Sequence, residues 1–225
     1  GVYERGLDDI WKEVLLNQFH DVLPGSSIRR VYEETGARYR AILARIGEET
    51  ARVLGGGEKK CALNATSFSR GEYLKCGDAW YRAEAKPWSL TALVPAKGKG
   101  SCRARGLRIE NGLILAEFSE KGELTRLFDK ENGREAMCGG NTFRLYDDSF
   151  DAWDTYVGYP GSDAQTLRGR RVGYISEGFR AGIVFEYAFG GSLLRQTVTL
   201  REGDRALYFG NHISWQETKK MLRVD

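Results

Sequence analysis

The stretch LNQFHDVLPGSS, residues 16–27, holds a histidine and an aspartate side by side. The imidazole of His20 can ligate a metal ion through a neutral ring nitrogen. The carboxylate of Asp21 can accept charge-assisted hydrogen bonds from hydroxyl groups. The other histidine, His212, alternates with apolar residues in a predicted strand, so we expect it on the more polar face. The His-Asp pair is therefore the first candidate for a functional site.

Two predicted helices would position this pair. Apolar residues recur at three-and-four spacing over residues 7–22, which predicts a helix with one apolar stripe. A turn that begins at Pro24 ends this helix. Ser26 or Ser27 can then cap a second helix over residues 28–54. We therefore expect a helical hairpin.

The predicted first helix determines where His20 should point. A rotation of about 100° per residue places it opposite the apolar stripe, near Leu16 and with Asp21 on one flank. We expect the imidazole to face away from the helical core. An exposed histidine, or one that interacts with the helix C-terminus, is the alternative to a metal ligand. The apolar Leu16 beside it indicates a surface that another domain or a ligand covers.

The hydrophobic period changes to two after the glycines at 55–57. Apolar-rich stretches separated by turn clusters indicate many strands without a long helix between them. Asn111-Gly112 lies between two such stretches and predicts a two-residue hairpin turn with positive φ angles. The predicted fold class is α then β and mostly β: a helical hairpin from a helix-bundle domain over residues 1–57, then a large antiparallel β-sandwich over residues 58–225.

The segment YDDSFDAWDTY holds four aspartates around Trp153. Carboxylates and an aromatic platform are the groups that a sugar site uses, and we expect Trp153 and Asp154 to contact a sugar. The alternative is a solvated acidic loop whose tryptophan is anchored in the sandwich. A calcium loop is a weaker hypothesis, because the segment lacks the glycine and closing glutamate of an EF-hand.

Charge and composition exclude several classes of partner. The 34 basic and 31 acidic residues are well mixed and give a net charge of +3, so we expect no nucleic-acid partner. No apolar run approaches the roughly 20 residues that cross a bilayer, so we expect no membrane association. The four cysteines are scattered without a CxxC spacing, which favours reduced thiols and a cytoplasmic location. From the sequence at both chain ends we expect a piece of a longer protein. The sequence leaves open whether the protein forms a homo-oligomer.

The stretch LLNQFHDVLPGSSIRRVYEET resembles the helical segment of the family 38 glycoside hydrolases, the retaining α-mannosidases. The near-consecutive form N-Q-F-H-D-x-x-P-G-S-S carries this resemblance. Weaker similarities follow in the family's order, in ALNATSFSRGE, IENGLILAEFSEKGELTRLFDKENGRE, NTFRLYDDSFDAWDTY and ISWQETKKMLRV. The resemblance therefore extends over almost the whole chain.

The resemblance implies a zinc site in which His20 is one ligand and Asp21 contacts the bound mannose. It also implies that the nucleophile, the acid/base carboxylate and the other zinc ligands lie in a catalytic domain that precedes this segment in the same chain. We therefore expect a retaining, zinc-dependent α-mannosidase that acts on mannose-containing oligosaccharides or glycans, with no catalytic residue in this piece and no activity of the piece alone. The alternative is a non-catalytic carbohydrate-binding or scaffolding β-sandwich module, and a large upstream coding region would decide between the two.

Overall fold

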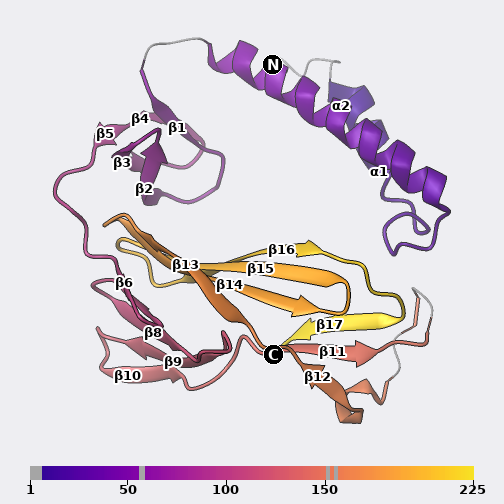
Figure 1. Ribbon diagram of the computed structural model, residues 1–225. Helices are drawn as coiled ribbons and strands as arrows, with labels where there is room; N and C mark the ends of the chain where they lie inside the picture. Colours follow the sequence, from indigo (N-terminus) through magenta and orange to yellow (C-terminus); the bar gives the residue numbers. More distant parts are fainter. Residues whose placement is uncertain (1–6, 56–58, 151–152, 155–156) are drawn as a thin grey trace. The chain divides into compact units, whose positions relative to one another are not determined.

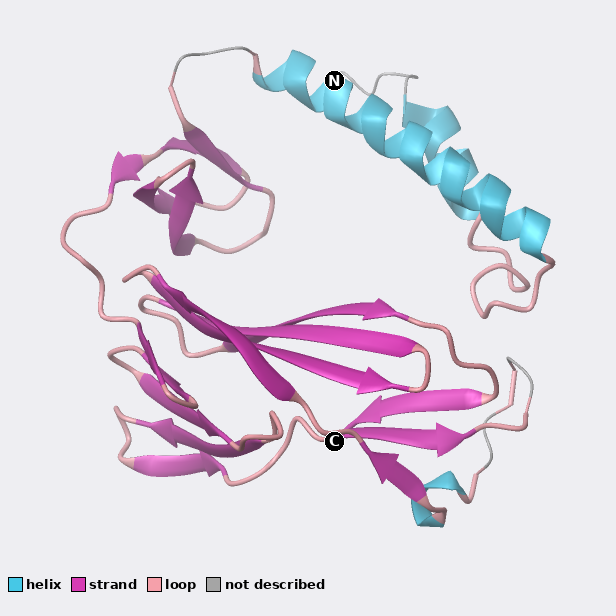
Figure 2. Cartoon of the chain, in the orientation of Figure 1, coloured by secondary structure: helices cyan, strands magenta, loops and turns pink. Residues whose placement is uncertain are grey.

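The computed structural model describes residues 7–55, 59–150, 153–154 and 157–225. Two α-helices come first, and the strands that follow are joined by turns and a 3-10 helix at Tyr159–Gly161 (Figure 2). Every strand pairing between the described residues is antiparallel. The predicted α-then-β fold class is confirmed. No helix among the described residues is long and apolar enough to span a membrane.

By its internal contacts the chain divides into two compact units. The first comprises Gly1–Glu58 and Ser149–Val157, and the second comprises Lys59–Asp148 and Gly158–Asp225. The segment Ser149–Val157 thus belongs with the helices, although strands precede and follow it in the sequence. The boundary that we expected between residues 57 and 58 falls outside the described residues.

Helix α1 spans Asp8–Leu16 and is therefore shorter than the predicted helix over residues 7–22. Both the backbone N–H of Asn17 and its side-chain amide donate to the carbonyl oxygen of Glu13, at 3.1 and 2.7 Å. These bonds satisfy a carbonyl that the helix end would otherwise leave without a partner. A series of turns follows, and the prediction of helix at His20 is wrong.

Helix α2 (Arg29–Leu54) has the predicted length. Its N-cap residue is Ile28, which makes no side-chain capping bond, so the expected capping by Ser26 or Ser27 is wrong. At its other end Gly55 has a φ of 70°, a backbone conformation that glycine adopts without steric cost. Glycine therefore ends this helix as the sequence predicts.

The strands of the second unit, all but β7 labelled in Figure 1, are β1 (Cys61–Asn64), β2 (Arg70–Cys76), β3 (Ala79–Ala85), β4 (Ser89–Ala92), β5 (Val94–Pro95), β6 (Arg103–Arg105), β7 (Arg108–Glu110), β8 (Ile114–Phe118), β9 (Leu124–Asp129), β10 (Arg134–Met137), β11 (Phe143–Asp147), β12 (Ala164–Thr166), β13 (Arg170–Ser176), β14 (Arg180–Phe189), β15 (Ser192–Arg201), β16 (Leu207–Ser214) and β17 (Lys220–Val224). Three of the sheets have the strand orders β13-β14-β15-β16, β10-β9-β8-β7-β6 and β12-β11-β17. Two further sheets, β1-β4 and β2-β3-β5, precede them in the sequence.

The hydrophobic core of the second unit joins strands from the sheets β13-β14-β15-β16, β10-β9-β8-β7-β6 and β12-β11-β17. Ile109 on β7 and Ala116 on β8 share one buried cluster with Ile183 and Phe185 on β14 and Val198 on β15, and all five are fully buried. Each large apolar side chain removed from water in this way contributes about 1.5–3 kcal/mol. The alternating pattern that predicted the strands is therefore the pattern that builds the core.

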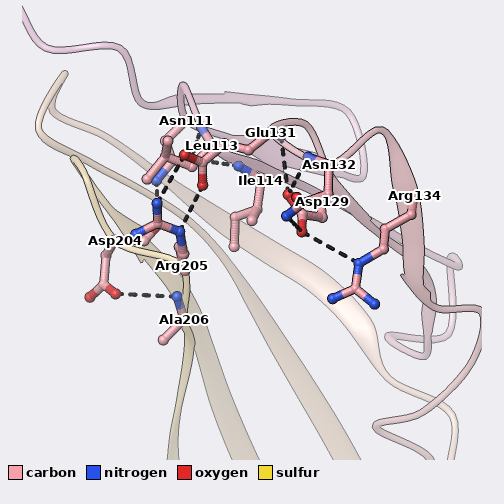
Figure 3. A network of polar contacts seen from close by, with 10 residues as sticks. All are labelled: Asn111, Leu113, Ile114, Asp129, Glu131, Asn132, Arg134, Asp204, Arg205 and Ala206. Carbon is pink, nitrogen blue, oxygen red and sulfur yellow. Dashed lines mark hydrogen bonds and ion pairs between the residues drawn. The ribbon is translucent and has the colours of Figure 1, made fainter.

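Asn111 lies between β7 and β8, but it does not form the predicted turn. Neither it nor Gly112 has a positive φ. The asparagine side chain is buried instead, accepting hydrogen bonds from the N–H groups of Leu113 and Ile114 at 2.8 and 2.9 Å. Its amide donates to the carbonyl oxygen of Arg201 and to that of Asp204, both at 2.8 Å. Figure 3 shows this asparagine where the hairpin meets the loop before β16. Four hydrogen bonds of one side chain thus replace the expected turn.

Candidate functional site

The His-Asp pair lies in the turns between α1 and α2. The side chain of His20 is 66% exposed and that of Asp21 is 50% exposed. The imidazole Nε2 and the carboxylate Oδ2 are 3.6 Å apart. His20 is therefore an exposed residue of a turn, and its exposure does not depend on the helical face that the sequence predicted.

The backbone of this turn is held by hydroxyl groups. The carbonyl oxygen of Asp21 accepts hydrogen bonds from the Ser27 hydroxyl at 2.8 Å, the Tyr32 hydroxyl at 3.2 Å and the Ser26 hydroxyl at 3.4 Å. The Tyr32 hydroxyl also accepts from the backbone N–H of Ser27 at 2.9 Å. Gly25 has a φ of 91°, which the chain needs to reverse here. The two serines therefore fix the His-Asp turn, which is a role other than the helix cap expected of them.

A second anchor lies on the other side of the pair, at Asn17. This asparagine is 6% exposed, and its Oδ1 accepts a hydrogen bond from the Thr35 hydroxyl at 2.9 Å. Glu13 on α1 and Arg38 on α2 form an ion pair at 3.3 Å nearby. These contacts tie the end of α1 to α2, so the His-Asp turn is held at both of its ends.

A cavity of about 230 Å³ adjoins the turn. Apolar and polar side chains line this cavity. They are Leu16, Asn17, Phe19, Val22, Val31, Glu34, Thr35 and Arg38. Neither His20 nor Asp21 lines it. This cavity therefore lies between the turn and α2 and is separate from the exposed His-Asp pair.

Sequence reasoning missed two of the residues that hold the turn. Tyr32 is an aromatic residue within the predicted second helix, and the spacing gives no reason to single out Thr35. The position of Tyr32 near the start of the second helix was the one sequence feature that indicated its role. A tyrosine there can donate a hydrogen bond to a carbonyl group of the preceding loop. Residue type alone does not distinguish that role from packing.

Trp153 lies beside the imidazole of His20. The two ring centroids are 6.2 Å apart, and the ring planes are tilted by 49°. Trp153 is 55% exposed and belongs to the segment Ser149–Val157 of the helical unit, so it is not anchored in the sandwich core. Asp154, the next residue, is exposed in the same segment. The structure therefore brings His20, Asp21 and Trp153 together in one unit.

Asp147 and Asp148 of the acidic segment lie at the end of β11 and directly after it. Asp147 ends β11, where its carboxylate pairs with Lys220. The backbone N–H of Asp148 donates to the carbonyl oxygen of Lys219 at 2.9 Å. Asp151 lies outside the described residues. The carboxylate of Asp147 thus serves the pairing of β11 with β17.

The donor chemistry of the pair fits a zinc ion as part of a ligand set. An exposed imidazole nitrogen is a usual zinc ligand, and a complete tetrahedral site has four ligands. Among the residues that the structure describes, no group of three or more histidine, cysteine, aspartate or glutamate side chains is placed to hold a metal. His212 is exposed on β16, opposite Arg195 of β15. The imidazole of His20 therefore fits as a single zinc ligand, and the described residues do not complete a tetrahedral set around it.

Comparison with known proteins agrees with the resemblance seen in the motif. The profile described as "Alpha mannosidase middle domain" matches residues 2–54. "Alpha-mannosidase 2C1" of Homo sapiens is 29% identical over 97% of this chain, and the protein of the same name from Mus musculus is 28% identical over the same share. The chain spans 24% of the length of these two relatives. A protein of Saccharomyces cerevisiae named "Alpha-mannosidase" is 27% identical over 67% of this chain, which covers 14% of that protein.

The fold is also similar to that of a solved structure. "The crystal structure of an alpha-mannosidase from Enterococcus faecalis V583" superposes with a TM-score of 0.67 and 15% identity, covering 96% of this chain and 38% of that one. The profile "Glycosyl hydrolases family 38 C-terminal domain" matches residues 109–225, which is more than half of the chain. The chain therefore belongs to glycosyl hydrolase family 38.

Proposed function

We propose that this chain is the His-Asp-bearing part of a longer, zinc-dependent α-mannosidase. The observation that carries the proposal is the exposed imidazole of His20 beside the Asp21 carboxylate, on a turn fixed by hydrogen bonds at both ends. Family membership supports the reaction class, and the 24% coverage of the curated relatives supports a longer whole protein. In this proposal, residues 1–57 are part of a helix-bundle domain and residues 58–225 form the β-sandwich domain.

Each residue of the cluster has a proposed role. His20 ligates zinc through one ring nitrogen. Asp21 and Asp154 accept hydrogen bonds from sugar hydroxyls, and the indole of Trp153 packs on the C–H face of a mannose ring. The zinc ion, when bound, supplies a Lewis-acidic template for sugar hydroxyls. The side chains of this chain therefore bind and orient the sugar.

Retention of configuration requires a nucleophilic carboxylate and an acid/base carboxylate about 5–5.5 Å apart, on either side of the glycosidic bond. We place both in an upstream domain of the whole protein and propose no catalytic residue in this chain. The substrate class is a mannose-containing oligosaccharide or glycan. The four free cysteines support a cytoplasmic location, because disulfides are rare there.

The direct test compares the purified 225-residue chain with the whole protein on 4-nitrophenyl α-mannoside. We expect turnover by the whole protein and no turnover by the chain alone. Turnover by the chain alone would overturn the placement of the catalytic carboxylates upstream. A whole protein that binds mannose oligosaccharides without hydrolysing them would support a non-catalytic carbohydrate-binding module instead.

A further inference from the structure

We propose that Trp153 is a positioning residue for His20, in addition to any contact that it makes with a sugar. The indole restricts the orientation of the imidazole and thereby directs the nitrogen that binds the metal. This inference deepens the proposed function and rests on it for the metal. The orientation of the ring itself can be measured without a metal.

Different groups hold the backbone of the turn and the imidazole ring. Hydroxyl groups fix the carbonyl of Asp21, and Asn17 fixes the start of the turn. None of these bonds involves the imidazole. The distance of 3.6 Å between His20 Nε2 and Asp21 Oδ2 is too long for a hydrogen bond. The carboxylate beside the imidazole therefore does not fix its rotation.

Two aromatic rings lie against the imidazole instead. The Phe19 ring centroid is 4.1 Å from that of His20 with a tilt of 43°, and the Trp153 centroid is 6.2 Å away with a tilt of 49°. The Trp153 pair lies within the range of about 4.5–7 Å in which ring pairs attract each other beyond the effect of buried area. Phe19 belongs to the same turn, whereas Trp153 comes from a segment far downstream. Trp153 is therefore the contact that adds a constraint from outside the turn.

The consequence follows from the chemistry of ligand histidines. A histidine that binds a metal is usually oriented by a hydrogen bond to its other nitrogen, and removing such an orienting group lowers metal affinity about 10- to 100-fold. The imidazole of His20 makes ring contacts with Phe19 and Trp153, and these contacts take the place of such an orienting hydrogen bond. Trp153 belongs to the same compact unit as His20, so this ring contact lies within one unit.

The orientation can be tested by NMR on the 225-residue chain, because only two histidines give imidazole signals. An indole ring shifts the signals of protons held beside it. We expect Trp153→Leu to move the His20 imidazole signals towards those of an unstructured peptide and to leave those of His212 unchanged. Trp153→Phe retains a ring and should retain most of the displacement. Trp88→Leu is the matched control, since Trp88 is an exposed tryptophan of the other unit.

Unmoved His20 signals in a folded Trp153→Leu variant would overturn the inference. If Trp153→Leu does not fold, Trp153→Phe provides the test, and loss of the displacement in that variant would overturn the inference equally.

The metal is tested separately, in the whole protein, by titration with zinc. We expect Trp153→Leu to weaken zinc binding about 10- to 100-fold and Trp153→Phe to restore most of the affinity. A tryptophan that only contacts the sugar would raise KM and leave zinc affinity unchanged, and that outcome would overturn the positioning role. The failure of the proposed function has a different signature: His20→Ala would then leave zinc affinity unchanged while the NMR result stands.

Discussion

The hydroxyl of Tyr32 lies 3.2 Å from the carbonyl oxygen of Asp21 and donates a hydrogen bond to it. The same hydroxyl accepts from the backbone N–H of Ser27 at 2.9 Å. One side chain of α2 thus joins two points of the turn that carries His20. The geometry of the His-Asp pair therefore depends on the second helix, since the first ends before it.

Replacing Tyr32 with phenylalanine keeps the ring and removes the three hydrogen bonds of the hydroxyl, to the carbonyl oxygens of Asp21 and Val22 and from the N–H of Ser27. Each such bond contributes about 0.5–1.5 kcal/mol net, and about 1.4 kcal/mol corresponds to a tenfold change in rate. We expect Tyr32→Phe to lower kcat/KM of the whole protein about tenfold with 4-nitrophenyl α-mannoside. Tyr39→Phe, a change of the same kind on α2, is the control and should have little effect. Equal activities of the two variants would contradict this role of the hydroxyl.

Asn111 is expected to be a stability determinant of the second unit. Alanine at this position removes four hydrogen bonds and leaves the buried N–H of Ile114 and three partly buried backbone groups without this partner. The expected loss in free energy of unfolding is about 2–4 kcal/mol, measured by denaturant titration. Asn132 is an exposed asparagine of the same network (Figure 3), and Asn132→Ala should cost less than about 1 kcal/mol. A loss at Asn111 no larger than that at Asn132 would refute the interpretation.

Gly169 packs directly against Tyr187. A Cβ added there would lie 2.7 Å from two carbons of the tyrosine ring and 2.8 Å from the carbonyl oxygen of Lys121. Tyr187 is buried in the core, so it has little room to move. We expect Gly169→Ala to lower the free energy of unfolding by about 1–3 kcal/mol. Gly139→Ala meets no atom within 4 Å and is the control. Equal thermal stability of both variants would show that this contact does not constrain the core.

Glu110 should make stability depend on pH. The Lys130 ammonium donates to its carboxylate at 2.6 Å and lowers the pKa of Glu110 below its ordinary value of 4.5, and Arg108 adds to this effect. Because the folded pKa is the lower one, the contribution is present above pH 4.5 and is lost as the pH falls through the folded pKa.

The difference in Tm between the natural chain and Glu110→Gln is therefore expected to shrink between about pH 6 and about pH 3. Glu120→Gln, at an exposed position, should show no such trend. A constant difference for Glu110→Gln across this range would contradict the assignment.

The sequence predicted those parts of the molecule that depend on local pattern. The change of period at the glycines 55–57 separated helices from strands, and turn clusters located hairpins such as β9 with β10 and β14 with β15. The errors lie where a side chain has a distant partner. Asn17 ends α1 early while bonded to Thr35, and Asn111 bonds the loop before β16. Neither partner is visible from sequence spacing.

Part of the candidate site could likewise be predicted from the sequence, and part of it depends on contacts between distant residues. Residue type and motif identify His20 and Asp21, and the structure places both on an exposed turn. Trp153 stands out as an aromatic residue in an acidic segment, but its position beside His20 joins distant parts of the sequence. The hydroxyl of Tyr32 could not be identified in this way, because an aromatic residue on a helix stripe usually packs.

The most direct test of the central claim measures zinc content and α-mannosidase activity of the whole protein carrying His20→Ala, with His212→Ala as the control. If His20 ligates the metal, the first variant should lose its zinc and at least about 100-fold in kcat, because loss of a ligand weakens a site at least as much as loss of an orienting group. His212→Ala should keep both. A His20→Ala protein that retains stoichiometric zinc and natural activity would contradict the account.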